Sequence, residues 1–97
     1  MNKIENLQNY KILITGASGF IGSNLAKRLL ENYPEIKQVI GLDNMNDYYD
    51  VHIKEARLAE LQKFENYVFV KGNLADKDTV TGIFEQYHPN IVVNLAA

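Results

Sequence analysis

Four short runs of apolar residues divide the chain, at residues 11–15, 38–43, 67–72 and 90–95. Each run is rich in valine, isoleucine or aromatic residues, and its apolar positions are consecutive, without alternating polar ones. Such continuous runs are typical of strands that are covered on both faces, as in a parallel sheet. The pattern therefore predicts four buried strands.

Three segments between these runs have the periodicity of a helix, at about residues 19–32, 50–64 and 77–87. The third follows Asp76, a residue type that caps helix N-termini. The periodicity assigns these residues to the apolar faces: Ile21, Leu25 and Leu29; Ile53, Ala56, Leu61 and Phe64; Val80, Ile83, Phe84 and Tyr87. Strands that alternate with such helices predict an α/β fold with a parallel sheet, in the order β-α-β-α-β-α-β.

The composition is that of one small globular domain: 97 residues, 46% hydrophobic and 23% charged, with a net charge of −2. Charges of both signs are interspersed and form no basic stripe, so nucleic acid is not expected as a partner. No apolar run approaches the roughly 20 residues that span a bilayer, so no membrane segment is expected. The absence of cysteine excludes disulfides and is compatible with the cytoplasm, where we expect the protein.

The stretch ILITGASGFIG, residues 12–22, joins the first predicted strand to the first predicted helix. Its glycines fall at 16, 19 and 22, the spacing of a loop that holds the diphosphate of a dinucleotide. Gly16 would allow the turn, Gly19 would let the diphosphate approach the backbone, and Gly22 would let the helix pack on the sheet. The alternative is a tight turn without a ligand, which would not require the conformational entropy cost of three glycines.

Asp43 ends the second apolar run, 21 positions after Gly22. A carboxylate near this position, about 20 residues on, accepts hydrogen bonds from the hydroxyls of an adenosine ribose. It would also repel a 2′-phosphate, and no arginine follows immediately, so NAD is favoured over NADP as the cofactor. The alternative interpretation is a solvated acid at the end of a strand.

These residues resemble the extended short-chain dehydrogenase/reductases, which include the sugar-nucleotide epimerases and dehydratases. TGASGFIG matches their TGxxGxxG pattern, and GLDNMNDYYDVHIKEARL, residues 41–58, is similar to the segment that follows the second strand of UDP-glucuronate 4-epimerases. Residues 70–76 and 91–97 are similar to the family's third-strand and fourth-strand motifs. The resemblance covers residues 11–97, which implies the N-terminal part of a doubly wound Rossmann sheet with strand order 3-2-1-4, preceded by an extension at residues 1–10.

The resemblance also implies how this part binds NAD. The implied cofactor-binding residues are Gly16, Gly19, Phe20, Ile21 and Gly22 at the diphosphate; Asp43, Asn44 and Asn46 at the ribose; Asn73 and Leu74 at the adenine; and Leu95, Ala96 and Ala97 under the nicotinamide half. The family usually has aspartate where this chain has Asn73. The side-chain carbonyl of Asn73 can still accept a hydrogen bond from the adenine amine. Residues 95–97 can equally be the end of a buried strand, and Tyr48 and Tyr49 can lie near the cofactor or cover the core.

The resemblance further implies a hydride cycle, in which NAD oxidises a sugar at C4 and the hydride returns to the other face. A Tyr-x-x-x-Lys pair on one helix face supplies the base. Residues 33–37 and 67–71 spell this pattern, but Pro34 breaks the first helix. The second pair falls in a strand, where four residues span roughly 13 Å. We therefore assign no catalytic residue and no metal ligand.

The chain is thus expected to be the cofactor-binding part of a longer epimerase, inactive alone, with a UDP-sugar bound only by the full-length parent. Alternatives are a nucleotide-sugar dehydratase or reductase of the same superfamily, and a non-enzymatic nucleotide-binding module. If the chain ends after the fourth strand, its apolar edge is a template for pairing with another chain. We therefore expect self-association through this strand, and weak or undetectable binding of NAD.

Overall fold

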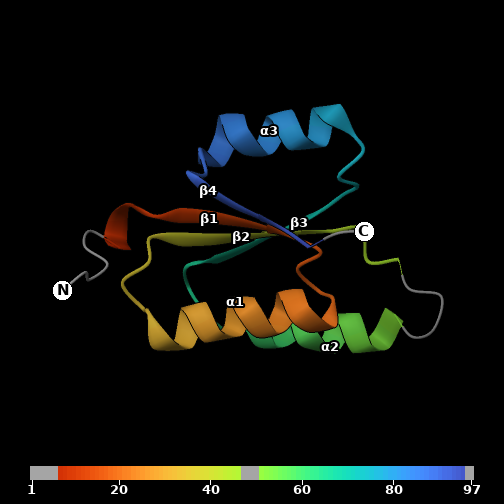
Figure 1. The fold of residues 1–97 in the computed structure, drawn as a ribbon. Helices are drawn as coiled ribbons and strands as arrows, with labels where there is room; N and C mark the ends of the chain where they lie inside the picture. The colour runs from red at the N-terminus through yellow and green to blue at the C-terminus, as the bar shows by residue number, and fades with distance from the viewer. Residues whose placement is uncertain (1–6, 47–50, 96–97) are drawn as a thin grey trace.

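The computed structural model describes residues 7–46 and 51–95 (Figure 1). Its elements are, in order, a 3₁₀ turn at Leu7–Asn9, β1 (Lys11–Thr15), α1 (Phe20–Asn32), β2 (Gln38–Asp43), α2 (Val51–Leu61), β3 (Tyr67–Lys71), α3 (Lys77–Tyr87) and β4 (Ile91–Asn94). The predicted alternation of strands and helices is confirmed. The second helix is shorter than predicted, because it ends at Leu61 and Phe64 lies in the turn that leads to β3.

The four strands form one parallel sheet in the order β3-β2-β1-β4, as predicted. β1 lies inside the sheet and pairs Ile14 with Gly41 of β2 on one side and with Val93 of β4 on the other. Figure 1 shows α1 and α2 against one face of the sheet and α3 against the other. This is the N-terminal part of a doubly wound α/β fold.

The core has two parts because successive residues of a strand point to opposite faces of the sheet. Ile12 and Ile14 of β1 pack in the cluster that includes Leu30 of α1 and Leu61 of α2. Leu13, between them, packs in the cluster that includes Ile83 of α3. Burial of each such side chain contributes about 1.5–3 kcal/mol, so both faces stabilise the sheet.

The periodicity predicts the buried faces of the helices only in part. The predicted residues that pack in the two clusters are Leu25, Leu29, Leu61, Phe64, Ile83 and Tyr87. Ile21 is exposed, and α1 instead buries Gly22, Ser23, Ala26 and Leu30, because the close approach of Gly22 to the loop rotates the helix. Ile53 and Ala56 of α2 and Phe84 of α3 are also exposed. In α2 the half-buried positions include Lys54 and Arg57, whose polar groups reach the loop after β1. An apolar pattern alone could not assign this face correctly.

β4 is at one end of the sheet and pairs with β1. Val93 packs against the core, but Val92 is 50% exposed, and Ile91 and the following Leu95 are also exposed. The prediction that this run is a strand buried on both faces is therefore wrong, because within the described residues no helix covers the outer side chains of β4. The self-association expected from this strand stays a prediction. Within the part of the chain that the structure describes, no helix is long and apolar enough to cross a membrane.

Candidate functional site

A cavity of about 470 Å³ opens at the carboxyl edge of the sheet, where β1 and β2 end. The residues predicted from the sequence that line it are Gly16, Gly19, Asp43, Asn44, Asn46, Asn73, Leu74 and Leu95. Phe20, Ile21 and Gly22 lie beside it at the start of α1, and Ala96 and Ala97 lie outside the described residues, as do Tyr48 and Tyr49. The fold therefore brings segments far apart in the sequence to one edge, where open α/β sheets bind ligands.

The glycine loop is fixed to β2 and to α1 by its backbone. Gly16 adopts φ 72°, a left-handed conformation that favours glycine, and its N–H donates to the Leu42 carbonyl at 2.8 Å. A Cβ added to Gly22 would overlap the carbonyl oxygen of Gly16, so only glycine lets α1 approach the loop this closely. These two positions explain the predicted turn and the predicted close packing.

α1 begins directly at the cavity. Gly19 is its N-cap residue and makes no side-chain cap, and the first turn holds no acidic side chain. The first N–H groups of a helix have no intrahelical partner and carry a partial positive charge. The start of α1 therefore offers backbone donors to an anion, and Phe20 and Ile21 lie there with exposed side chains.

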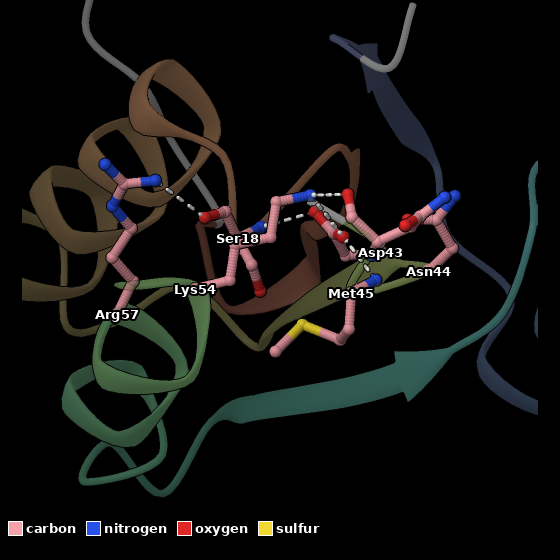
Figure 2. Close-up of polar contacts among 7 residues, drawn as sticks. Ser18, Asp43, Asn44, Met45, Lys54 and Arg57 are labelled. Carbon is pink, nitrogen blue, oxygen red and sulfur yellow. Dashed lines mark hydrogen bonds and ion pairs between the residues drawn. The ribbon is translucent and has the colours of Figure 1, made fainter. Parts of the chain in front are cut away.

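Asp43 is the centre of the polar contacts at this edge (Figure 2). Its side chain is 3% exposed. One oxygen, Oδ2, accepts from the backbone N–H of Ser18 at 2.9 Å. The other, Oδ1, accepts from the N–H of Met45 at 2.7 Å and from the Lys54 ammonium at 3.1 Å. Asp43 thus ties together the glycine loop, the segment after β2, and α2.

Two cations of α2 were not predicted as site residues. Lys54 also donates to the Asn46 carbonyl at 3.1 Å, and its side chain is 15% exposed. Arg57, one helical turn later, donates to the Ser18 carbonyl at 3.2 Å, and its guanidinium lies 5.8 Å from the centre of the Phe20 ring. The i, i+3 spacing of the two cations could have indicated a shared face, but only with the position of α2 already known.

The two ends of the cavity are held by short polar contacts. At the β3 end, Asn73 Oδ1 accepts from the Ala75 N–H at 2.9 Å, which leaves this oxygen one further acceptor site. At the β4 end, Thr15 Oγ1 donates to Asn94 Oδ1 at 2.5 Å and accepts from the Leu95 N–H at 3.0 Å. These contacts place Leu95 at the wall of the cavity.

Neither Tyr-x-x-x-Lys stretch lies on a helix. Tyr33 is the C-cap of α1, whereas Tyr67 and Lys71 are the two ends of β3. Burial, and to a lesser extent the charge of Asp43, raises the pKa of Tyr67 well above its ordinary value, the opposite of the lowered pKa that suits a tyrosine base. Within the described ranges, no group of three or more acidic or histidine side chains could hold a metal ion.

Comparison with known proteins identifies the family. Residues 13–97 match the family described as GDP-mannose 4,6 dehydratase. The chain belongs to this family. The family match, a curated epimerase and a solved dehydratase confirm the resemblance to nucleotide-sugar epimerases and dehydratases of the short-chain dehydrogenase/reductase type.

The relatives of this GDP-mannose 4,6-dehydratase family member include epimerases and dehydratases. The UDP-glucuronate 4-epimerase of Thermodesulfobacterium geofontis is 44% identical over 85 residues, 88% of this chain and 25% of that protein. The dTDP-glucose 4,6-dehydratase of Bacillus anthracis, solved in complex with NAD, has a TM-score of 0.78 at 30% identity, over 91% of this chain and 27% of that one.

A second solved relative is the UDP-glucuronic acid 4-epimerase of Bacillus cereus, in complex with UDP-glucuronic acid and NAD. It has a TM-score of 0.76 at 30% identity, over 90% of this chain and 26% of that one. The chain spans about a quarter of the length of the curated relatives that it matches. The likeness therefore concerns the N-terminal, Rossmann-like part of these enzymes.

Proposed function

We propose that this chain binds NAD and is the cofactor-binding part of a longer nucleotide-sugar epimerase of the UDP-glucuronate 4-epimerase type. One observation carries the proposal: the start of α1 at Gly19, which has no side-chain cap, and the buried carboxylate of Asp43 line the same cavity. The helix start can bind an anion such as a diphosphate, and the carboxylate can accept from a ribose hydroxyl. The NAD in two solved relatives supports this assignment.

In this proposal the diphosphate lies at Gly16, Gly19 and the backbone of Phe20 and Ile21. The remaining contacts are those implied by the sequence: Asp43, Asn44 and Asn46 toward the ribose, Asn73 and Leu74 toward the adenine, and Leu95, Ala96 and Ala97 toward the nicotinamide half. When bound, NAD supplies hydride transfer at C4 of the sugar. The residues of this chain bind and orient the cofactor and leave the proton transfers to the rest of the parent.

The proposal includes the inactivity of the chain alone, because neither tyrosine–lysine stretch has the helical geometry that couples the pair. It also places UDP-sugar binding in the full-length parent, and the parent in the cytoplasm. The segment GLDNMNDYYD favours an epimerase over the dehydratase or reductase alternative, since it is the stretch similar to UDP-glucuronate 4-epimerases. A stand-alone nucleotide-binding module is the remaining alternative, which an assay of the full-length parent with UDP-glucuronate and NAD distinguishes.

The cofactor proposal is tested by titration of the 97-residue chain with ADP-ribose and NAD, followed by the amide shifts of the glycine loop. Gly19→Ala is the informative variant, because its Cβ would occupy the approach to the helix start. That Cβ would lie 3.3 Å from the Gly16 carbonyl oxygen, a tight contact that a shift of a few tenths of an ångström relieves. We expect binding to weaken about tenfold or more, the loss of one charge-assisted hydrogen bond.

Gly82→Ala is the matched control, since a Cβ there meets nothing within 4 Å on α3. It should leave ADP-ribose binding unchanged. Equal affinities in the Gly19 and Gly82 variants would contradict the placement of the diphosphate at α1, and shifts confined to other parts of the chain would contradict the cavity itself.

We further propose that the isolated chain self-associates through β4, by antiparallel pairing with a second copy across a two-fold axis. The exposed side chains of Ile91, Val92 and Leu95 and the position of β4 at the end of the sheet support this. Sedimentation over a range of concentrations should give a dimer that Val92→Lys converts to a monomer. A wild-type monomer at high concentration would contradict the proposal.

A further inference from the structure

Lys54 lies beside Asp43 at the predicted ribose site, where the sequence indicated an acid but no cation. Its ammonium is held between Asp43 Oδ1 and the carbonyl of Asn46, both at 3.1 Å, and it lines the cavity beside the predicted ribose residues. Figure 2 shows it reaching across from α2 to the carboxylate. Lys54 lies eleven residues after Asp43, so it is not among the residues that immediately follow the acid in the sequence.

We propose that Lys54 is a specificity-determining residue of the nucleotide site: it meets the 2′ oxygen of the adenosine ribose and makes this corner tolerant of a 2′-phosphate. The chain then accepts NADP with only a modest preference for NAD. This inference rests on the proposed function, because it concerns the ribose end of the same cofactor.

The first argument is a count of hydrogen-bonding sites. A carboxylate has about four acceptor sites, and Ser18, Met45 and Lys54 occupy three of those on Asp43. Asp43 therefore has room for one ribose hydroxyl and not for two while Lys54 stays in place. An ammonium has three N–H donors, and the Lys54 contacts with Asp43 and Asn46 use two. The third is available to the second ribose oxygen.

The second argument is the charge of the corner. Among the described residues that line the cavity, Asp43 and Lys54 are the two that carry a full charge, and they form an ion pair. The repulsion that a lone carboxylate would exert on a 2′-phosphate is therefore largely cancelled at this point. Arg57 does not contribute to this balance, because its guanidinium donates to the Ser18 carbonyl on the other side of the loop.

The test compares the dissociation constants of NAD and NADP, or of ADP-ribose and its 2′-phosphate, by calorimetry on the full-length parent. In the wild type we expect the two constants to differ by less than about tenfold. Lys54→Met should weaken the phosphorylated ligand about tenfold or more relative to the other, the effect of one lost charge-assisted hydrogen bond. Lys54→Arg should restore the wild-type ratio.

Lys63→Met is the matched control, since Lys63 is exposed and pairs with Glu60 away from the cavity. A wild-type preference for NAD above about a hundredfold, near 2.8 kcal/mol, would overturn the inference even if Lys54→Met failed to fold. Equal weakening of both ligands by Lys54→Met would also overturn it, because a purely structural role acts on both. Binding of neither ligand to the full-length parent would overturn the proposed function together with this inference.

Discussion

Tyr67 provides a direct test of how the sheet supports the glycine loop. Its ring is buried in the core under α1 and α2, and its hydroxyl lies so close to Gly41 that a Cβ there would overlap it. Among the described residues the hydroxyl has no hydrogen-bond partner. A buried polar group left without a partner costs about 1–3 kcal/mol. We expect Tyr67→Phe to raise the free energy of unfolding at neutral pH by about that amount, because the ring and its packing remain.

The same residue predicts an alkaline instability. Burial first, and the charge of Asp43 second, raises the pKa of Tyr67 above its ordinary value near 10. The unfolded chain loses this proton as the pH passes that value, whereas the folded chain retains it. The stabilising contribution is therefore complete below pH 10 and falls as the pH rises, by up to about 1.4 kcal/mol per pH unit. The phenylalanine variant lacks this loss.

Urea unfolding followed by circular dichroism, at about pH 7 and about pH 11, measures both effects. The advantage of Tyr67→Phe over the wild type should be present at neutral pH and larger in alkali. Tyr33→Phe is the control, because Tyr33 is exposed at the end of α1 and should change neither quantity. A destabilised Tyr67→Phe at neutral pH would refute the reasoning, since it would show that the hydroxyl makes a favourable hydrogen bond.

Two further substitutions follow from the polar contacts. Asp43→Ala should destabilise the fold by about 3–5 kcal/mol in urea unfolding, because it leaves Lys54 without its buried partner and Ser18 without an acceptor. It should also abolish any preference for NAD over NADP. An unchanged preference would show that Asp43 does not contact the ribose. Asp76→Ala should lower the free energy of unfolding by about 0.5–2 kcal/mol in the same assay, because the Asp76 side chain caps α3 by accepting from the Asp78 N–H. A loss of nucleotide binding in this variant would contradict a purely structural role of Asp76.

The fold was predictable because its signals are local and agree with one another. Continuous apolar runs marked all four strands, although only β1 and β2 are buried along most of their length. The glycines marked the loop that joins β1 to α1 at the site. The strand order was different in kind, because it came from a resemblance and not from periodicity. The rotation of α1 could not be predicted, since it depends on the contact of Gly22 with the Gly16 carbonyl, which only the tertiary structure reveals.

The site was predictable only in part, for a related reason. Asp43 has a fixed spacing from the glycines, so the sequence located it. Lys54 and Arg57 lie on α2, whose apolar pattern assigned Ile53 and Ala56 to the core while the structure exposes them. Hydrophobic periodicity detects a helix face that packs on apolar side chains. It does not detect a face that packs on a polar loop through hydrogen bonds.

These contacts explain why a buried carboxylate is tolerated at Asp43 without any ligand. Burying a charge is costly unless hydrogen bonds and an opposite charge compensate for it. Here two backbone N–H groups and one ammonium do so, and they come from the glycine loop, the segment after β2, and α2. The carboxylate therefore sets the relative position of three segments before any nucleotide arrives. A substitution of Asp43 alters both structure and binding. A substitution of Lys54 also removes a partner of the buried carboxylate, but it leaves the two backbone donors to Asp43 in place. The ratio of the two dissociation constants in Lys54 variants, and not either constant alone, therefore separates ligand selectivity from the assembly of the site.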